Sequence, residues 1–146
     1  AKKRELDLGI DQLRYRSVYL PIVRNAMPEV LELFDAADPS LVVGARDVTT
    51  VPSQSLYLLN SPFVVEQSRD FAKRLLAASP QGGAPRVQLA FQLAFGRPAT
   101  DEEVTQVASL VRRAAKGGGA NSLSELDGWA CFTQALLASA EFRYVY

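Results

Sequence analysis

The stretch from Asp47 to Leu76, DVTTVPSQSLYLLNSPFVVEQSRDFAKRLL, contains the turn around which the rest of the chain is predicted to pack. An apolar block, Leu56 to Leu59, runs into Asn60, Ser61 and Pro62. Serine is a preferred N-cap residue, and proline suits the first helical position, where its missing N–H has no intrahelical partner to lose. Helical spacing then gives one apolar stripe, made of Val64, Ser68, Phe71, Ala72, Leu75 and Leu76. The stretch predicts a tight helix–turn–helix corner at the centre of a helical domain.

Further helices are predicted on the C-terminal side of this corner. A Gly/Pro-rich loop over 79–85 precedes a helix expected at about 86–95, and Arg97 is expected to form a salt bridge or to cap the end of that helix. Thr100 to Glu103 and Ser122 to Glu125 both match the capping box, in which side chain and backbone of the two end residues bond reciprocally. The helix after Ser122 is apolar on several sides, in two stripes: Leu126, Trp129, Ala130, Thr133, Leu136, Leu137 and Ala140, and Phe132, Ala135 and Phe142. Such a helix is normally central in its bundle.

The N-terminal third is less regular. Residues 1–16 suggest a short amphipathic helix, and 16–24 an extended segment that pairs at most with 41–43, because Pro21 argues against a central strand. A helix is expected over 25–37, with Pro28 in its first turn. The predicted fold class is all-α: an irregular bundle of five to six helices with at most a short two-stranded ribbon. We expect a single domain over 1–146, excised from the C-terminal part of a larger multidomain protein.

Composition excludes several classes of function. Sixteen basic and sixteen acidic residues cancel, whereas nucleic-acid binders usually carry a basic excess. Histidine is absent, which removes Ser–His and Cys–His catalysis and most zinc and haem-iron sites. Cys131 is the single cysteine, so no disulfide forms within the chain, and its apolar surroundings predict a buried thiol. No apolar run reaches the roughly 20 residues of a membrane span, and the charged start is unlike a signal peptide.

One set of polar residues gathers in the sequence around the loop before the corner. Its members are Arg24, Asn25, Asp35, Asp38, Arg46, Asp47, Thr49, Thr50, Gln54 and Asn60. Three hypotheses account for them. The aspartates could hold a hard cation such as calcium, although their spacing is not that of an EF-hand loop. Asp35 and Asp38 could act as a carboxylate pair in sugar chemistry. Alternatively, these aspartates pair with Arg24 or Arg46 and pin the loop, while Thr49 and Asn60 cap helices or satisfy backbone groups.

Aromatic residues suggest two further binding surfaces. Tyr15, Tyr19 and Tyr57 could stack on sugar rings, which makes carbohydrate a candidate ligand, but aromatics flanked by Leu and Val are more often part of a core. The C-terminal run from Glu141 to Tyr146 could bind a partner, or its aromatics could dock into the core.

Four long blocks of the chain resemble a known family. RSVYLPIVRNAMPEVLELFDAADPS, RDVTTVPSQSLYLLNSPFVVEQSRDFAKRLL, LAFQLAFGRPATDEEV and WACFTQALLASAEFRYVY occur in that order. They resemble the C-terminal half of the planctomycete-type domain of unknown function that closes large secreted bacterial proteins with an N-terminal cytochrome-c-like domain. The resemblance implies export to the periplasm or cell surface, and it implies that haem belongs to domains outside this chain, which has no Cys-x-x-Cys-His motif. It brings no catalytic residue and no cofactor for this chain.

Two hypotheses of function follow from these observations. The first is a non-catalytic helical interaction or scaffolding module that packs against other domains of its parent protein or against a cell-surface partner. The alternative is part of a polysaccharide-acting hydrolytic or redox enzyme, with a site shared with missing domains. The first predicts an exposed apolar patch, whereas the second predicts convergent carboxylates with a raised pKa.

Overall fold

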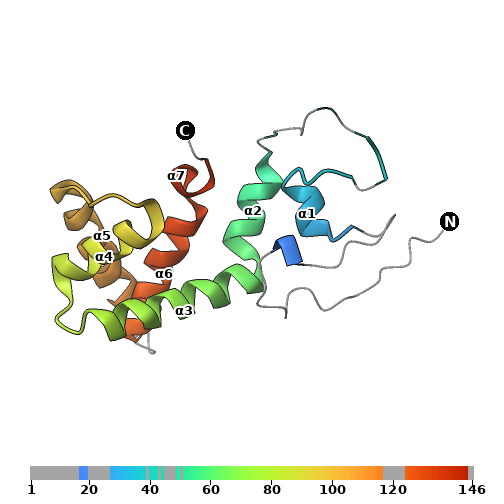
Figure 1. Ribbon diagram of the computed structural model, residues 1–146. Helices are drawn as coiled ribbons and strands as arrows, with labels where there is room; N and C mark the ends of the chain where they lie inside the picture. The colour runs from blue at the N-terminus through green and yellow to red at the C-terminus, as the bar shows by residue number, and fades with distance from the viewer. Residues whose placement is uncertain are drawn as a thin grey trace. The chain divides into compact units, whose positions relative to one another are not determined.

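The protein is helical in every regular part that the structure describes. A computed structural model describes residues 17–19, 27–38, 40–42, 44, 49, 51–116 and 124–144. Within these ranges it contains seven α-helices, a 3-10 turn at Ser17–Tyr19 and no strand (Figure 1). The prediction of a predominantly all-α protein is confirmed.

Contacts divide the chain into two compact units, 1–57 and 58–146, which are described separately. The single domain expected over 1–146 stays a prediction.

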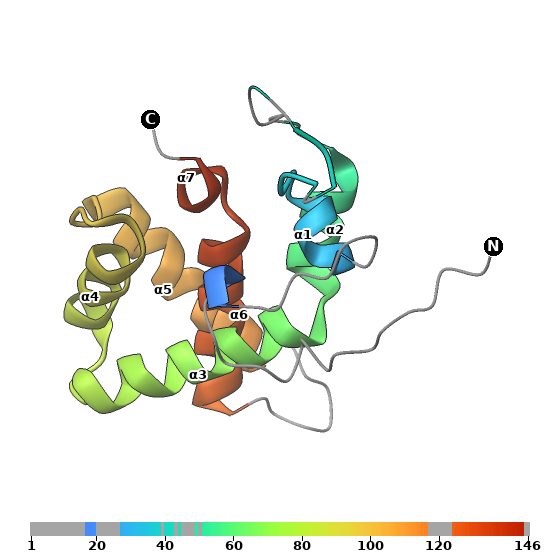
Figure 2. The same ribbon diagram turned by 45° about the vertical axis from the view of Figure 1, so that its right-hand side comes forward.

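The first unit contains α1 (Glu29–Leu33) and most of α2 (Pro52–Asn60), which lie side by side in Figures 1 and 2. The buried side chain of Gln54 joins them, because its Nε2 donates to the backbone oxygens of Leu33, at 3.0 Å, and Thr49, at 3.2 Å. The rings of Phe34 and Tyr57 meet edge to face with centroids 5.8 Å apart. This part of the chain is held mainly by a few contacts between α1, α2 and Thr49, with no fully buried apolar residue in α1.

Helix α1 is shorter than the predicted helix over 25–37. Pro28 is the residue before the helix rather than part of its first turn. Asp35 has a φ of +56°, the left-handed conformation that ends helices and that a short polar residue tolerates better than most. The extended segment predicted over 16–24 is wrong at Ser17–Tyr19, which form a 3-10 turn; its remaining residues lie outside the described ranges. Its expected partners Leu41 and Val42 are exposed and are not in a strand.

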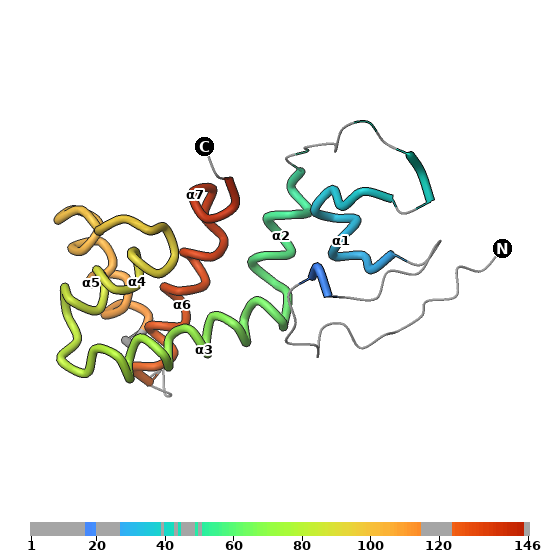
Figure 3. Tube along the Cα trace, viewed as in Figure 1, coloured from blue at the N-terminus to red at the C-terminus, as the bar shows by residue number. Residues whose placement is uncertain are grey.

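The second unit is a bundle built around α6. It consists of α3 (Pro62–Ala78), α4 (Gly83–Phe95), α5 (Asp101–Lys116), α6 (Glu125–Ala138) and α7 (Ala140–Arg143). Helix α6 contacts each of the other four, as the Cα trace in Figure 3 lets the reader follow. The prediction of a central last helix is therefore confirmed. The core of the unit consists of Ala72, Leu75, Val87, Ala90, Phe91, Ala99, Val107, Trp129, Phe132 and Leu136.

The stripe predicted for the helix after Pro62 is confirmed. Val64, Ser68, Ala72 and Leu75 are buried along α3, and Phe71 and Leu76 pack against the core while remaining partly exposed. Burying a leucine such as Leu75 contributes roughly 1.5–3 kcal/mol. The hydroxyl of Thr133 on α6 donates to the backbone oxygen of Ser68 at 2.8 Å, so the two helices approach closely at small residues.

Two helix starts differ from the predictions. Ser61 is the N-cap of α3 and Pro62 is its first residue, but the Ser61 hydroxyl makes no capping hydrogen bond. Helix α4 begins at Gly83, inside the predicted loop. Pro85 then falls in its first turn, where a missing N–H costs no intrahelical bond.

Helix α6 uses a capping box two residues later than predicted. Ser124, not Ser122, is the N-cap: the Asp127 amide donates to the Ser124 hydroxyl at 3.3 Å, and the Ser124 amide donates to the Asp127 carboxylate at 3.2 Å. Asp127 also pairs with Arg69 of α3, and Glu125 pairs with Arg86 of α4. These contacts to neighbouring helices favour this register.

Cys131 and Phe142 are exposed, contrary to prediction. The buried face of α6 carries Trp129, Phe132, Thr133 and Leu136. At about 100° per residue, position 131 points away from that face, and Ala135, one turn later, is exposed with it. Phe142 lies beyond the break at Ser139, where α6 ends and α7 begins, so it does not continue the stripe of α6.

Candidate functional site

Three of the predicted polar residues come together in the first unit. The Asp35 carboxylate accepts from the Thr49 backbone N–H at 2.7 Å and from the Thr49 hydroxyl at 2.8 Å. The Gln54 amide reaches the Thr49 backbone oxygen from the other side, at 3.2 Å. Asp35 and Thr49 are 14 residues apart, so these bonds close a long loop. This arrangement is the loop brace proposed from the sequence, with Thr49 as a partner of Asp35.

The other predicted residues do not join this group in the ranges described. The Asp38 carboxylate accepts from the nearby Ser40 amide at 2.7 Å, which is a local turn contact. Asn60 is the exposed last residue of α2. Five of the predicted residues lie outside the described ranges: Arg24, Asn25, Arg46, Asp47 and Thr50. In the part of the chain that the structure describes, no three Asp, Glu, His or Cys side chains gather as metal ligands would; calcium stays a hypothesis.

The predicted aromatic surface is also divided. Tyr19 is 72% exposed, Tyr57 packs on Phe34, and Tyr15 lies outside the described residues. Carbohydrate binding stays a prediction.

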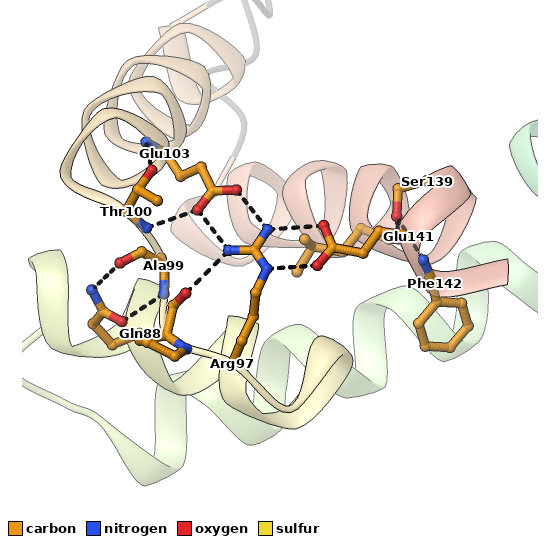
Figure 4. Close-up of polar contacts among 10 residues, drawn as sticks. Gln88, Arg97, Ala99, Thr100, Glu103, Ser139, Glu141 and Phe142 are labelled. Atoms are coloured by element: carbon orange, nitrogen blue, oxygen red, sulfur yellow. Dashed lines mark hydrogen bonds and ion pairs between the residues drawn. The ribbon is translucent and has the colours of Figure 1, made fainter. Parts of the chain in front are cut away.

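The most connected charged group is Arg97, directly after α4. Gly96 ends that helix in the left-handed conformation, with φ +72°, which glycine adopts without a steric penalty. Arg97 then projects between the start of α5 and α7 (Figure 4). Its Nη1 and Nη2 donate to the two carboxylate oxygens of Glu103 at 3.0 and 2.8 Å. Its Nε and Nη2 donate to the carboxylate of Glu141 at 2.6 and 2.8 Å.

A fifth bond, from Nη1 to the Pro98 oxygen at 3.1 Å, completes the set. Arginine has five N–H donors, so the Arg97 guanidinium is fully used. It also lies 5.2 Å from the centroid of the Phe91 ring and 5.6 Å from that of Phe95. The expected salt bridge of Arg97 is confirmed, and it joins three helices rather than capping one.

This charge arrangement keeps both carboxylates ionised. The hydrogen bonds from Arg97 and the Thr100 amide lower the pKa of Glu103 to about 2, and Arg97 lowers the pKa of Glu141. The pKa of Arg97 is raised by the same two glutamates. A general acid needs the opposite shift, so this cluster is suited to joining helices and not to proton transfer.

The loop that presents Arg97 is itself held rigidly. The Gln88 side-chain amide exchanges two hydrogen bonds with the backbone of Ala99, both 2.8 Å long (Figure 4). The predicted capping box at the start of α5 is confirmed, because the Thr100 amide donates to Glu103 at 2.7 Å and the Glu103 amide donates to the Thr100 hydroxyl at 3.2 Å. Glu103 therefore caps α5 and binds Arg97 with the same carboxylate.

A second arginine, Arg86, joins three other helix segments from within the core. Its side chain is 4% exposed. Nε and Nη2 donate to the backbone oxygens of Ser79, at 2.9 Å, and Pro80, at 3.3 Å, which follow the end of α3. Nη1 donates to Glu125, in the first turn of α6, at 2.6 Å, and the Trp129 ring centroid lies 4.9 Å from Cζ. No sequence motif indicated this role, since Arg86 was taken only as the start of a helix.

The fold and these contacts define an all-helical protein whose arginines join helices to one another. Over residues 2–111 the chain matches the family described as "Protein of unknown function (DUF1553)", also labelled PSD1, and it belongs to that family. Among curated proteins and among solved structures, nothing matches it. Of the helices described, none has the length and apolar character to cross a membrane.

Proposed function

We propose that this chain is a non-catalytic interaction module of a larger exported protein, and that it docks through an apolar face of α2. The observation that carries the proposal is the exposure of two leucines on that helix. Leu56 is 57% and Leu59 54% exposed. They are three residues apart on one α-helix, so they share a face.

Two exposed leucines on one face favour association over solvation. Covering each would contribute on the order of 1 kcal/mol, and apolar side chains that share a face are typical of contact surfaces. The charged groups support the same conclusion, because Glu103, Glu141 and Asp127 are bound to arginines and have a lowered pKa. The occupant in this proposal is another domain of the parent protein or a cell-surface protein. Export follows from the family resemblance. The alternative, an enzyme site shared with other domains, stays a prediction.

Photo-crosslinking within the full-length parent protein tests the proposal. A benzophenone amino acid placed at Leu56 or Leu59 should crosslink, after irradiation and peptide mapping, to residues outside this chain. The matched control is Leu93, 45% exposed on α4. The double variant Leu56→Glu, Leu59→Glu should abolish the association that the crosslinks report. Crosslinks confined to this chain, or a yield no higher than at Leu93, would overturn the proposal.

A further inference from the structure

The end of α7 is held in a defined position. The Phe142 amide donates to the hydroxyl of the N-cap Ser139 at 3.2 Å, and the Tyr144 amide closes the last turn on the Ala140 oxygen at 2.9 Å. Both carboxylate oxygens of Glu141 are bound by Arg97. Arg143, the last residue of α7, is therefore presented by a fixed piece of backbone.

The guanidinium of Arg143 is incompletely satisfied. Its Nε and Nη1 are shielded from water and have no hydrogen-bond partner, and among the residues described they are the buried side-chain polar atoms in this condition. The Tyr144 ring centroid lies 5.1 Å from Cζ, so an aromatic face takes the place of an acceptor. Arg97 contrasts sharply, because all five of its donors are matched.

This condition is unfavourable unless something completes it. Arginine stays protonated in proteins, so Arg143 cannot relieve the problem by losing its charge. Each buried donor left without an acceptor costs about 1–3 kcal/mol, and more when it belongs to a charged group. A cation–π contact recovers only part of that cost. A planar anion that accepts from two nitrogens at once would recover most of it.

We infer that Arg143 is a recognition residue for the carboxylate of an acidic side chain on a partner polypeptide. Arg143 is partly exposed as a residue, so its guanidinium lies at the edge of the surface and not in the core. Its neighbour Phe142 is 43% exposed and offers apolar contact beside the charge. A peptide that carries an apolar residue next to the acidic one satisfies both, whereas a bare anion satisfies only the cation. The inference rests on α7 and not on the leucines of α2, so the two proposals can fail separately.

Side-chain NMR of the whole chain tests the inference. The probe is the peptide acetyl-Leu-Glu-Leu-amide, with acetyl-Leu-Gln-Leu-amide as its neutral match and sodium acetate as the bare anion. The Nε–Hε signal of Arg143, assigned with the Arg143→Lys variant, should shift saturably with the acidic peptide. The neutral peptide should bind at least about tenfold more weakly, because it offers no charge-assisted bond. The fully bonded Nε–Hε of Arg97 should stay unchanged in each titration.

The outcomes separate cleanly. Saturable binding of the acidic peptide that is lost in Arg143→Lys, at an unchanged melting temperature, supports the inference. Equal binding of acidic and neutral peptides, or acetate binding as tightly as the acidic peptide, overturns it. So does an Arg143 signal that moves only when residues are appended after Tyr146, because the carboxylate would then be the end of this same chain. The comparison of the peptides on the unmodified protein decides the question even if the variant unfolds.

Discussion

Arg97 and Glu103 show how one side chain can serve two local structures. Glu103 caps α5 through the Thr100 amide and at the same time receives two hydrogen bonds from Arg97. A guanidinium can meet two carboxylates at once because its five donors lie in one plane. A lysine at this position would offer a point charge with three donors and could not reproduce either bidentate contact.

Replacing Arg97 with lysine should therefore lower the melting temperature of the second unit. The charge remains, so the loss reports geometry and not net charge. Arg112→Lys is the matched control, because Arg112 is exposed on α5 and its Nε donates only to the Ala108 oxygen of its own helix. Circular dichroism melts should show a clear drop for Arg97→Lys and little change for the control. Equal melting temperatures would show that the paired hydrogen bonds add nothing beyond charge.

Arg86 leads to a prediction about its exposed partner. Glu125 is 67% exposed, but it supplies the negative charge for a guanidinium that is 4% exposed. Glu125→Ala should cost about 1–2 kcal/mol of unfolding free energy, since it leaves a buried cation without its counter-charge. Glu102→Ala, at an exposed glutamate of α5, is the control and should change stability by less than about 0.5 kcal/mol. Urea unfolding followed by the fluorescence of the single tryptophan, Trp129, measures both.

At the scale of the element, the start of α6 shows local signals competing. Ser122 to Glu125 and Ser124 to Asp127 both have the spacing of a capping box, and the structure uses the second. The second register places Asp127 beside Arg69 and Glu125 beside Arg86. Helix α4 makes a similar point, because its first turn includes residues that look like a loop in isolation. Packing against neighbours therefore determines where these helices begin.

The two serines give a direct comparison of the boxes. Ser124→Ala should cost about 1 kcal/mol, the usual loss when a side-chain cap is removed. Ser122→Ala, two residues earlier, should leave the urea midpoint within error of the unmodified protein. A larger loss at Ser122 than at Ser124 would mean that the box predicted from sequence is the one that forms in solution.

At the scale of the whole molecule, the paired carboxylates predict how stability depends on pH. The pKa of Glu103 is about 2 in the folded state against an ordinary value of 4.5, and the pKa values of Glu141 and Asp127 are also lowered. The unfolded state therefore binds these protons more readily. The stabilisation is complete above about pH 4.5 and is lost as the pH falls toward 2. Urea midpoints between pH 6 and pH 2.5 should fall steadily, and the slope should be shallower in Arg97→Lys; an identical slope would contradict this origin.

Calcium should not change the stability of the chain. In the structure the Asp35 carboxylate is bound by Thr49 and that of Asp38 by the Ser40 amide. A ligand that binds only the folded state raises the melting temperature. Melts with 2 mM-range calcium and with chelator, on the order of 100-fold above a weak extracellular site's dissociation constant of about 10⁻⁴ M or below, should therefore coincide. A rise with calcium would revive the cation hypothesis for the aspartates.

Much of the second unit could be predicted because its signals are local. The stripe on α3 and the box at Thr100 depend on residues three or four apart, within one turn of helix. The corner at Ser61 and Pro62 follows from backbone chemistry of the same range, although burial of Ser61 accompanies a hydroxyl that makes no cap. The short α1 was overestimated because its spacing suggests a longer helix, whereas the chain turns to left-handed geometry at Asp35.

The sequence by itself determined that this protein is helical, that its last long helix is central, and which face of α3 is buried, because helical periodicity encodes all three. Only the tertiary structure decided which charges meet. Arg97 and Glu141 are 44 residues apart, Arg86 and Glu125 39, and Asp35 and Thr49 14. No spacing along the chain specifies such pairs, since each forms only after helices distant in sequence have packed and brought the side chains within hydrogen-bonding distance.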